Sequence, residues 1–116
     1  MSDEKPASPL TLDIEHTGHT FVVKCHGKLV AGSCDFFYNE VRQLVPGTKK
    51  IVLDLSDLTR MDSMGLGTLA RLYVHAKSAN CRLELTHIGK QIRELLGITN
   101  MWQVFGTIGE HGIKMG

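Results

Sequence analysis

The sequence is poor in cysteine and has no long apolar run. Its 116 residues include only three cysteines, an odd number without Cys-x-x-Cys spacing: Cys25, Cys34 and Cys81. This usage favours free thiols over a disulfide framework, so we interpret the three residues as cytosolic thiols. No apolar run approaches the roughly 18 residues of a membrane-spanning helix, and residues 1–9 lack the apolar core of a signal peptide. We therefore expect a cytoplasmic protein without membrane insertion.

The chain also lacks an excess of charge of either sign. Thirteen Lys and Arg residues stand against twelve Asp and Glu residues, for a formal net charge of +1. This balance gives no electrostatic reason to expect nucleic acid or an anionic membrane as a direct partner. The composition, 42% hydrophobic and 22% charged, is that of a soluble globular protein of one domain.

The sequence patterns of common catalytic and cofactor sites are absent as well. The glycine pair Gly65-x-Gly67 lacks the spacing and the lysine of a P-loop, and no Gly-x-Ser-x-Gly elbow surrounds Ser63. No cysteine or carboxylate cluster completes a metal site around the six scattered histidines: His16, His19, His26, His75, His87 and His111. We therefore expect no enzymatic activity, no metal and no cofactor.

Alternation of apolar and polar residues predicts four strands. The first two, residues 10–15 and 20–26, are joined by a glycine-containing turn and predict an antiparallel hairpin. Apolar runs at residues 51–56 and 82–86 predict two further strands, each polar on one side. The outward-facing side carries these residues: Asp54, Ser56, Glu84 and Thr86.

Three helices are predicted between and after these strands. Ser33 is a plausible N-cap for the first, which ends at Pro46-Gly47 and has Phe37, Val41 and Leu44 on its buried face. The second reaches Ala79 with a buried stripe of Leu66, Leu69, Ala70, Tyr73 and Ala76. The third, ending at Gly97, buries Ile88, Ile92, Leu95 and Leu96.

The order β-β-α-β-α-β-α predicts an α/β fold with a mixed sheet of four to five strands. Parallel crossovers are right-handed, so a sheet that grows in one direction carries its helices mainly on one face. The one-sided polarity of the strands agrees with this. We expect a disordered leader at residues 1–9, a single domain at 10–108 and a flexible tail at 109–116.

The stretch from Met61 to Gly67 lies between the third strand and the central helix. Asp62 or Ser63 can cap the helix, and Gly65 and Gly67 allow loop and helix to approach closely. Loops supported by rigid elements on both sides commonly carry function. We interpret Ser63 as the displayed residue, with nearby methionines either filling the core or forming an adaptable contact rim.

Residues 52–67, which end in Asp62-Ser63-Met64-Gly65-Leu66-Gly67, resemble the signature of STAS domains and of bacterial anti-sigma-factor antagonists in particular. The resemblance extends from about residue 10 to 108 and includes Gly27-x-Leu29; Val30 and Met64 depart from the usual pattern. It implies a STAS fold and a phosphoacceptor at Ser63. The implied partner is a serine kinase of the ATPase-fold type that is also an anti-sigma factor. The implied partner-binding residues are Leu29, Met61, Asp62, Ser63, Met64, Gly65, Leu66 and Gly67.

Other functions stay open from the sequence. Resembling proteins include stand-alone STAS subunits of lipid-transport ATPases, in which the serine need not be phosphorylated. The Gly65–Gly67 turn is also compatible with a generic anion or nucleotide site. Asp54, near the end of a strand, is placed like the phosphoacceptor of a receiver domain, but no acidic pair follows the first strand.

Overall fold

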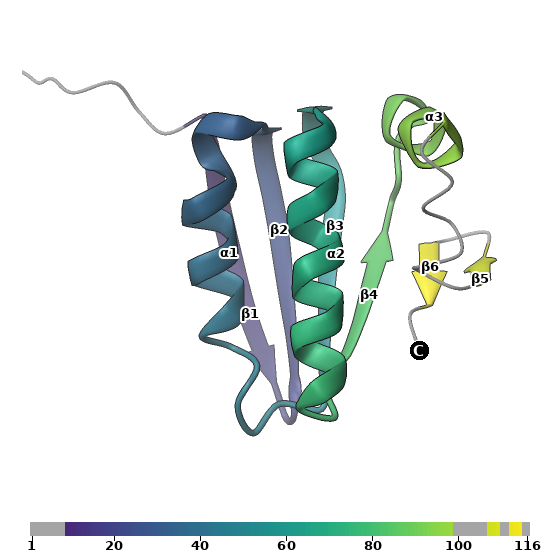
Figure 1. Ribbon diagram of the computed structural model, residues 1–116. Coiled ribbons are helices and arrows are strands. Elements are labelled where there is room, and N and C mark those ends of the chain that lie inside the picture. Colours follow the sequence, from purple (N-terminus) through teal and green to yellow (C-terminus); the bar gives the residue numbers. More distant parts are fainter. Residues whose placement is uncertain (1–8, 99–106, 110–111, 115–116) are drawn as a thin grey trace, which may run out of the picture.

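The computed structural model describes residues 9–98, 107–109 and 112–114. The order of elements through the third helix is the predicted one (Figure 1). The elements are β1 (Leu10–Thr17), β2 (Thr20–Leu29), the 3₁₀ helix η1 (Ala31–Ser33), α1 (Cys34–Arg42), β3 (Lys50–Met61), α2 (Ser63–Ser78), β4 (Arg82–Thr86), α3 (Lys90–Ile98), β5 (Thr107–Gly109) and β6 (Gly112–Lys114).

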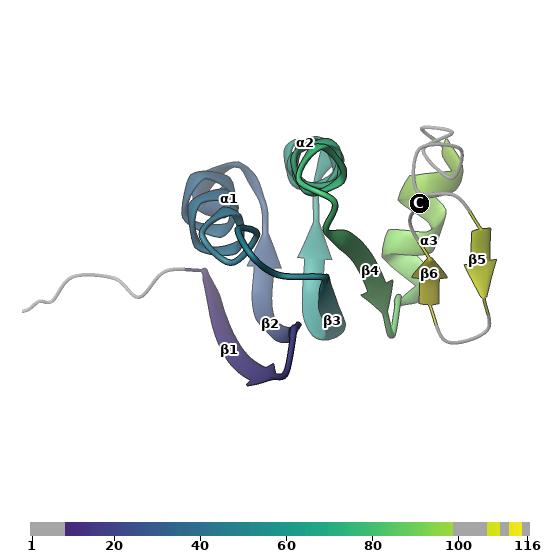
Figure 2. The same cartoon turned by 90° about the horizontal axis from the view of Figure 1, so that it is seen from below.

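The strands form one mixed sheet in the order β1-β2-β3-β4-β6-β5. β1 and β2 make the predicted antiparallel hairpin, and β2, β3 and β4 run parallel to one another. α1 and α2 lie side by side on one face of the sheet, while α3 runs across their direction beyond the end of β4 (Figures 1 and 2). The prediction of a mixed sheet with helices mainly on one face is confirmed.

The sheet has six strands, where the sequence predicted four to five. Residues 112–114, assigned from the sequence to a flexible tail, form β6 and pair antiparallel with β4, and β5 pairs with β6. The free edge of β4 offers unpaired backbone groups, which a short segment can satisfy without any apolar pattern of its own. The predicted leader, residues 1–9, lies outside the described residues except for Pro9.

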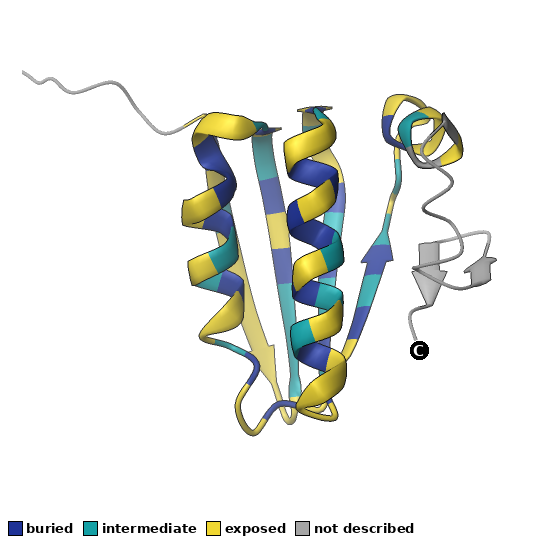
Figure 3. Ribbon diagram, in the orientation of Figure 1, coloured by how far each residue is buried: buried dark blue, intermediate teal, exposed yellow. Residues whose placement is uncertain are grey.

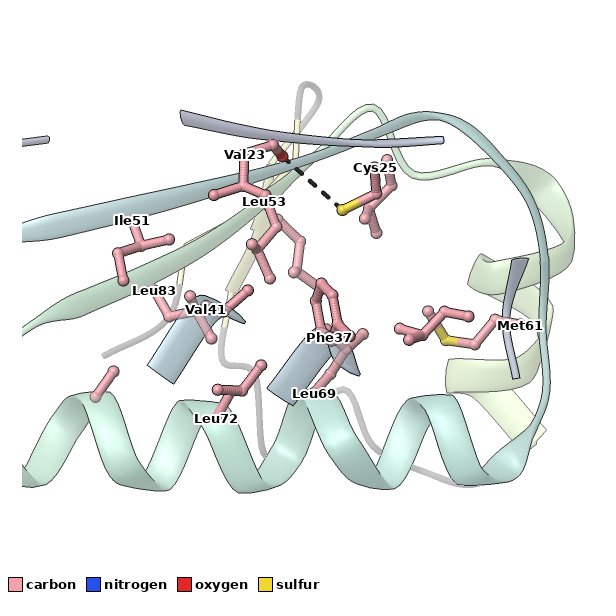
Figure 4. Close-up of a cluster of buried hydrophobic side chains, with 14 of the residues drawn as sticks. Val23, Cys25, Phe37, Val41, Ile51, Leu53, Met61, Leu69, Leu72 and Leu83 are labelled. Carbon is pink, nitrogen blue, oxygen red and sulfur yellow. Dashed lines mark hydrogen bonds between the residues drawn. The ribbon is translucent and has the colours of Figure 1, made fainter. Parts of the chain in front are cut away.

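The core lies between the sheet and the two parallel helices. On α1 and α2, buried positions recur along the sides that face the sheet (Figure 3). Phe37 of α1 lies at its centre, with Leu69 on the helix side and Leu53 on the sheet side (Figure 4). Burial and the charge of Asp54 raise the pKa of the Cys25 thiol to about 12, so this thiol stays protonated. All three cysteines are free and buried.

The predicted buried stripe of α2 needs correction. Leu72 belongs to the buried stripe of α2, whereas Ala70 and Tyr73 are only half-buried. The reason is that positions 69, 72 and 76 follow the three- and four-residue spacing that keeps one helix face on the sheet. On β1, Leu10 is buried but Ile14 is 40% exposed, because β1 is the edge strand.

β3 is twice the predicted length, and its additional residues bring the strand to within one residue of Ser63. The sequence predicted a strand at residues 51–56 followed by a loop, but β3 continues to Met61. The extension is paired with β2, whose Leu29 is the register partner of Met61. The extension contains several polar residues, so apolar–polar alternation did not predict it. Pairing with β2 keeps this part of β3 extended. Ser63 therefore follows a hydrogen-bonded strand after a single residue.

Candidate functional site

Asp62 connects two elements at the carboxyl edge of the parallel strands. Its Oδ1 accepts a hydrogen bond from the backbone N–H of Gly65 at 2.9 Å, which caps α2. Its Oδ2 accepts from the backbone N–H of Ala31 in η1 at 3.1 Å. Of the two caps considered from the sequence, Asp62 is the one used, so the Ser63 hydroxyl has no capping role.

Gly65 lies against the end of β2. A Cβ at this position would overlap the Leu29 carbonyl oxygen and lie 2.9 Å from Met61 Cγ and 3.0 Å from Leu29 Cγ. The same carbonyl accepts a hydrogen bond from the Asp62 N–H at 3.4 Å. Only glycine permits this approach. Gly67, two residues later, is exposed, and a Cβ added there would have no neighbouring atom within 4 Å.

The predicted partner-binding residues separate into a surface set and a supporting set. Ser63 and Gly67 are exposed, and Met64 is 59% exposed. The Ser63 hydroxyl makes no hydrogen bond with any described residue. The residues of the supporting set are buried, shape the helix start from beneath and are not available to a partner: Leu29, Met61, Gly65 and Leu66. Asp62 is half-buried between the two sets.

Phe36 adds to the exposed surface at this edge and was missed from the sequence. It lies in the first turn of α1 and is 41% exposed, while Met64 lies in the first turn of α2. Both helices begin at the same edge of the sheet (Figure 1). The adjacent pair Phe36-Phe37 was the available signal, because two neighbouring helix positions cannot both face the core. We call Phe36, Ser63, Met64 and Gly67 the helix-start surface.

Ser33 is at the predicted N-cap position of α1, but its side chain makes no capping hydrogen bond. Its hydroxyl donates to the Lys28 carbonyl at 2.8 Å and accepts from the Val30 N–H at 3.1 Å. Ser33 is buried, and these bonds close the turn that follows β2. The Ser33 hydroxyl therefore pairs with backbone groups of the turn that leads to η1, which are partly buried and need partners.

The functional group that this site presents is the Ser63 hydroxyl. The described residues do not form a metal site or a nucleotide site around it. No group of three or more His, Cys, Asp or Glu side chains among them can hold a metal ion. A nucleotide phosphate at Gly65–Gly67 is disfavoured, because the negatively charged Asp62 side chain already occupies the Gly65 N–H.

Asp54, which the sequence placed like the phosphoacceptor of a receiver domain, lies on the opposite, helix-free face. There it accepts a hydrogen bond from the Ser56 N–H and lies 3.3 Å from His87 Nδ1.

Replacing Asp62 with alanine is expected to lower the free energy of unfolding by about 1–2 kcal/mol, because the cap of α2 is lost. Asparagine at the same position keeps one oxygen that accepts from the Gly65 N–H, but its NH₂ group cannot accept a hydrogen bond from the Ala31 N–H. We therefore expect Asp62→Asn to lose roughly half as much. Urea unfolding of the two variants measures both values, and equal losses would contradict the two-bond arrangement.

The comparisons with known proteins agree with this fold. The sequence matches the STAS domain family over residues 11–111. A STAS-domain containing protein of Pseudomonas aeruginosa is 27% identical over 88 residues, which cover 76% of this chain and 87% of that relative. No helix in the described part of the chain is both long and apolar enough to cross a membrane. The chain belongs to the STAS domain family.

Solved structures of anti-sigma factor antagonists have the same fold. One from Mycobacterium paratuberculosis superposes with a TM-score of 0.74 at 20% identity, covering 86% of each chain. The antagonist SpoIIAA in its unphosphorylated form superposes with a TM-score of 0.70 at 16% identity, covering 86% of this chain and 90% of that one. The phosphorylated form of this Bacillus protein gives a TM-score of 0.66 at 16% identity, covering 86% and 93%.

Proposed function

We propose that this protein is a non-enzymatic, cytoplasmic antagonist of an anti-sigma factor, switched by phosphorylation of Ser63. One observation carries the proposal: Ser63 is exposed at the first turn of α2 while Asp62 performs the capping that a serine there would otherwise provide. A hydroxyl that the fold does not need is free to be modified. The STAS fold and the antagonists that share it support this class of function.

The unmodified helix-start surface suits an apolar contact. Met64 and Phe36 are its large exposed side chains, and methionine adapts readily to a partner surface. The partner we propose is a serine kinase of the ATPase-fold type that is also an anti-sigma factor. Binding of the unphosphorylated protein to this kinase would release a sigma factor and so regulate transcription.

Phosphate on Ser63 changes the surface and leaves the fold intact. It adds about −1.5 to −2 charges and three acceptor oxygens. The N-terminus of α2 tolerates this anion, because the helix dipole and the N–H groups that Asp62 does not occupy favour negative charge there. A partner that covers Ser63 and Met64 would have to remove water from this charge, beside the carboxylate of Asp62. The switch therefore acts on the partner.

The known phosphorylated form of SpoIIAA supports the proposal by analogy, since that protein shares the fold and is itself phosphorylated. We expect mass spectrometry of this protein from its native host to find phosphate on Ser63. Ser63→Ala, expressed in the same host, should carry none. Stoichiometric phosphate on another residue, with Ser63 unmodified in all growth phases, would contradict the proposal.

The same preparation tests the lipid-transport alternative. Affinity purification of wild type and of Ser63→Ala should recover an ATPase-fold kinase with both. Recovery of transporter subunits, with no kinase and no phosphate on Ser63, would instead establish a STAS subunit of a transport ATPase. The two outcomes are distinguished by protein identity, so neither depends on the strength of binding.

A further inference from the structure

A histidine is held between two carboxylates across three strands on the helix-free face of the sheet. His26 of β2 has its Nδ1 2.8 Å from Asp57 Oδ2 of β3. Its Nε2 is 2.8 Å from Asp13 Oδ2 of β1. His26 is one-third exposed, and the carboxylates are 72% exposed at Asp13 and 67% at Asp57. We call these three residues the three-strand clamp.

The clamp lies where the backbone ladder between β2 and β3 is irregular. The register shifts between Lys24 and His26 and again between Gly27 and Lys28. Gly27 has a φ of 109°, and a Cβ there would overlap the Pro9 carbonyl oxygen. Bulges of this kind leave ladder groups unpaired and bend the strand. The His26–Asp57 pair lies between the two shifts, so side chains hold the strands together where the ladder is interrupted.

Both strands run from the clamp directly to the Ser63 site. On β2, three residues lead from His26 to Leu29, on which Gly65 packs. On β3, four residues lead from Asp57 to Met61, the register partner of Leu29. The Asp62 N–H then donates to the Leu29 carbonyl. The relative position of these two short segments therefore sets how the start of α2 is presented.

We infer that His26 is a positioning residue for Ser63: in its protonated form it fixes the ends of β2 and β3 through the three-strand clamp. Loss of the proton loosens the start of α2. This inference rests on the proposed function only in taking Ser63 as the residue presented. According to this inference, pH controls how firmly the start of α2 is held, through the protonation of His26 and without phosphorylation of Ser63.

The chemistry of imidazole makes the clamp depend on protonation. An imidazolium donates from both ring nitrogens, whereas neutral imidazole has one N–H and can serve only one carboxylate. Hydrogen bonds to Asp57 and Asp13, with their negative charge, raise the pKa of His26 against an opposing effect of desolvation. The stabilising contribution is therefore complete below the ordinary histidine pKa and is lost as pH rises through the raised value.

Other charged groups face the clamp and have to be considered. Along β2, Lys24 and Lys28 are exposed on either side of His26, and they oppose its protonation. Along β3, Asp54 precedes Asp57 and is itself paired with a second histidine, His87. The flanking positions on β1 are Thr11 and Glu15, of which Glu15 is exposed and favours the charged form. A test must therefore separate His26 from His87.

Amide hydrogen exchange of the free full-length protein, followed by NMR, tests the inference. We expect the opening constants of the Asp62 and Gly65 amides, corrected for intrinsic exchange, to rise about threefold from roughly pH 5.5 to 8.5, an effect of the size that exposed ion pairs supply. The midpoint should coincide with the titration of the His26 ring. His26→Asn should remove the pH dependence, while His19→Asn, in the exposed β1–β2 turn, and His87→Asn should keep it.

Asp13→Asn provides a second variant on the edge strand in case His26→Asn does not fold. It should lower the measured pKa of His26 and shift the midpoint of amide opening with it. Opening constants that do not change with pH, or a pH dependence that survives His26→Asn, would overturn the inference. No partner is present in these measurements, so failure of the phosphorylation switch would leave this result unchanged, and the reverse also holds.

Discussion

Gly65→Ala is expected to lower the free energy of unfolding by about 2 kcal/mol, whereas Gly67→Ala is expected to raise it by roughly 0.5–1 kcal/mol. Both glycines lie in the first two turns of α2. Alanine favours a helix over glycine by about 1 kcal/mol at each position. The opposite signs therefore come from tertiary contacts alone.

The difference lies in what an added methyl group meets. At Gly65 it would overlap the Leu29 carbonyl oxygen, and this backbone atom also accepts the Asp62 N–H, so it cannot move aside freely. Overpacking of this kind costs about 3 kcal/mol where the neighbour is fixed, which exceeds the gain in helix propensity. At Gly67 the methyl group would project into open space.

Urea unfolding followed by circular dichroism measures both changes, with the slope of the transition as a check on two-state behaviour. Equal stabilisation by the two substitutions would show that α2 does not pack against the end of β2 as described. A large loss at Gly67 would show that this residue is covered by a contact outside the described residues.

Ser63→Glu is expected to weaken binding to the proposed anti-sigma kinase by roughly 100-fold. A charge forced into an interface without a partner costs about 3 kcal/mol, and each 1.4 kcal/mol is a factor of ten in the dissociation constant. Glutamate carries less charge than phosphate, so this value is a lower bound for the modified protein. The fold should be retained, because an acidic residue suits the first turn of a helix.

Calorimetric titration of each purified ATPase-fold kinase of the host measures this effect. Ser63→Ala should bind like wild type, since the hydroxyl makes no hydrogen bond with a described residue. Ser78→Glu is the matched control: it places the same charge on the same helix, roughly 22 Å along the axis and beyond the screening length of physiological salt. Undiminished binding of Ser63→Glu would refute the charge switch.

Local patterns were sufficient for the order of elements through the third helix and for the displayed serine. Alternation along residues 10–26 and the periodicity of Phe37 and Val41 depend on neighbours in the chain, and these predictions are confirmed. The position of Ser63 after a strand and before a helix follows from the same patterns. Its exposure is confirmed, whereas phosphorylation remains a prediction.

Features that depend on pairing could not be read from the sequence. The extension of β3 to Met61 exists because β2 is beside it, and β6 exists because β4 has a free edge. Likewise, nothing in the chain order indicates that Asp62 bonds to Ala31, 31 residues earlier. Each of these depends on which segments the fold brings together.

Local sequence patterns are enough to predict that a serine is displayed at the start of the central helix, between a strand and two glycines. Which residues form the surface around this serine depends on how the elements pack in three dimensions. Leu29 and Leu66, both expected to bind a partner, are buried, whereas Phe36 from another helix is exposed at the same edge. The three-strand clamp likewise joins residues of three strands. Burial and ion pairing across strands depend on distances in space, which the order of residues does not specify.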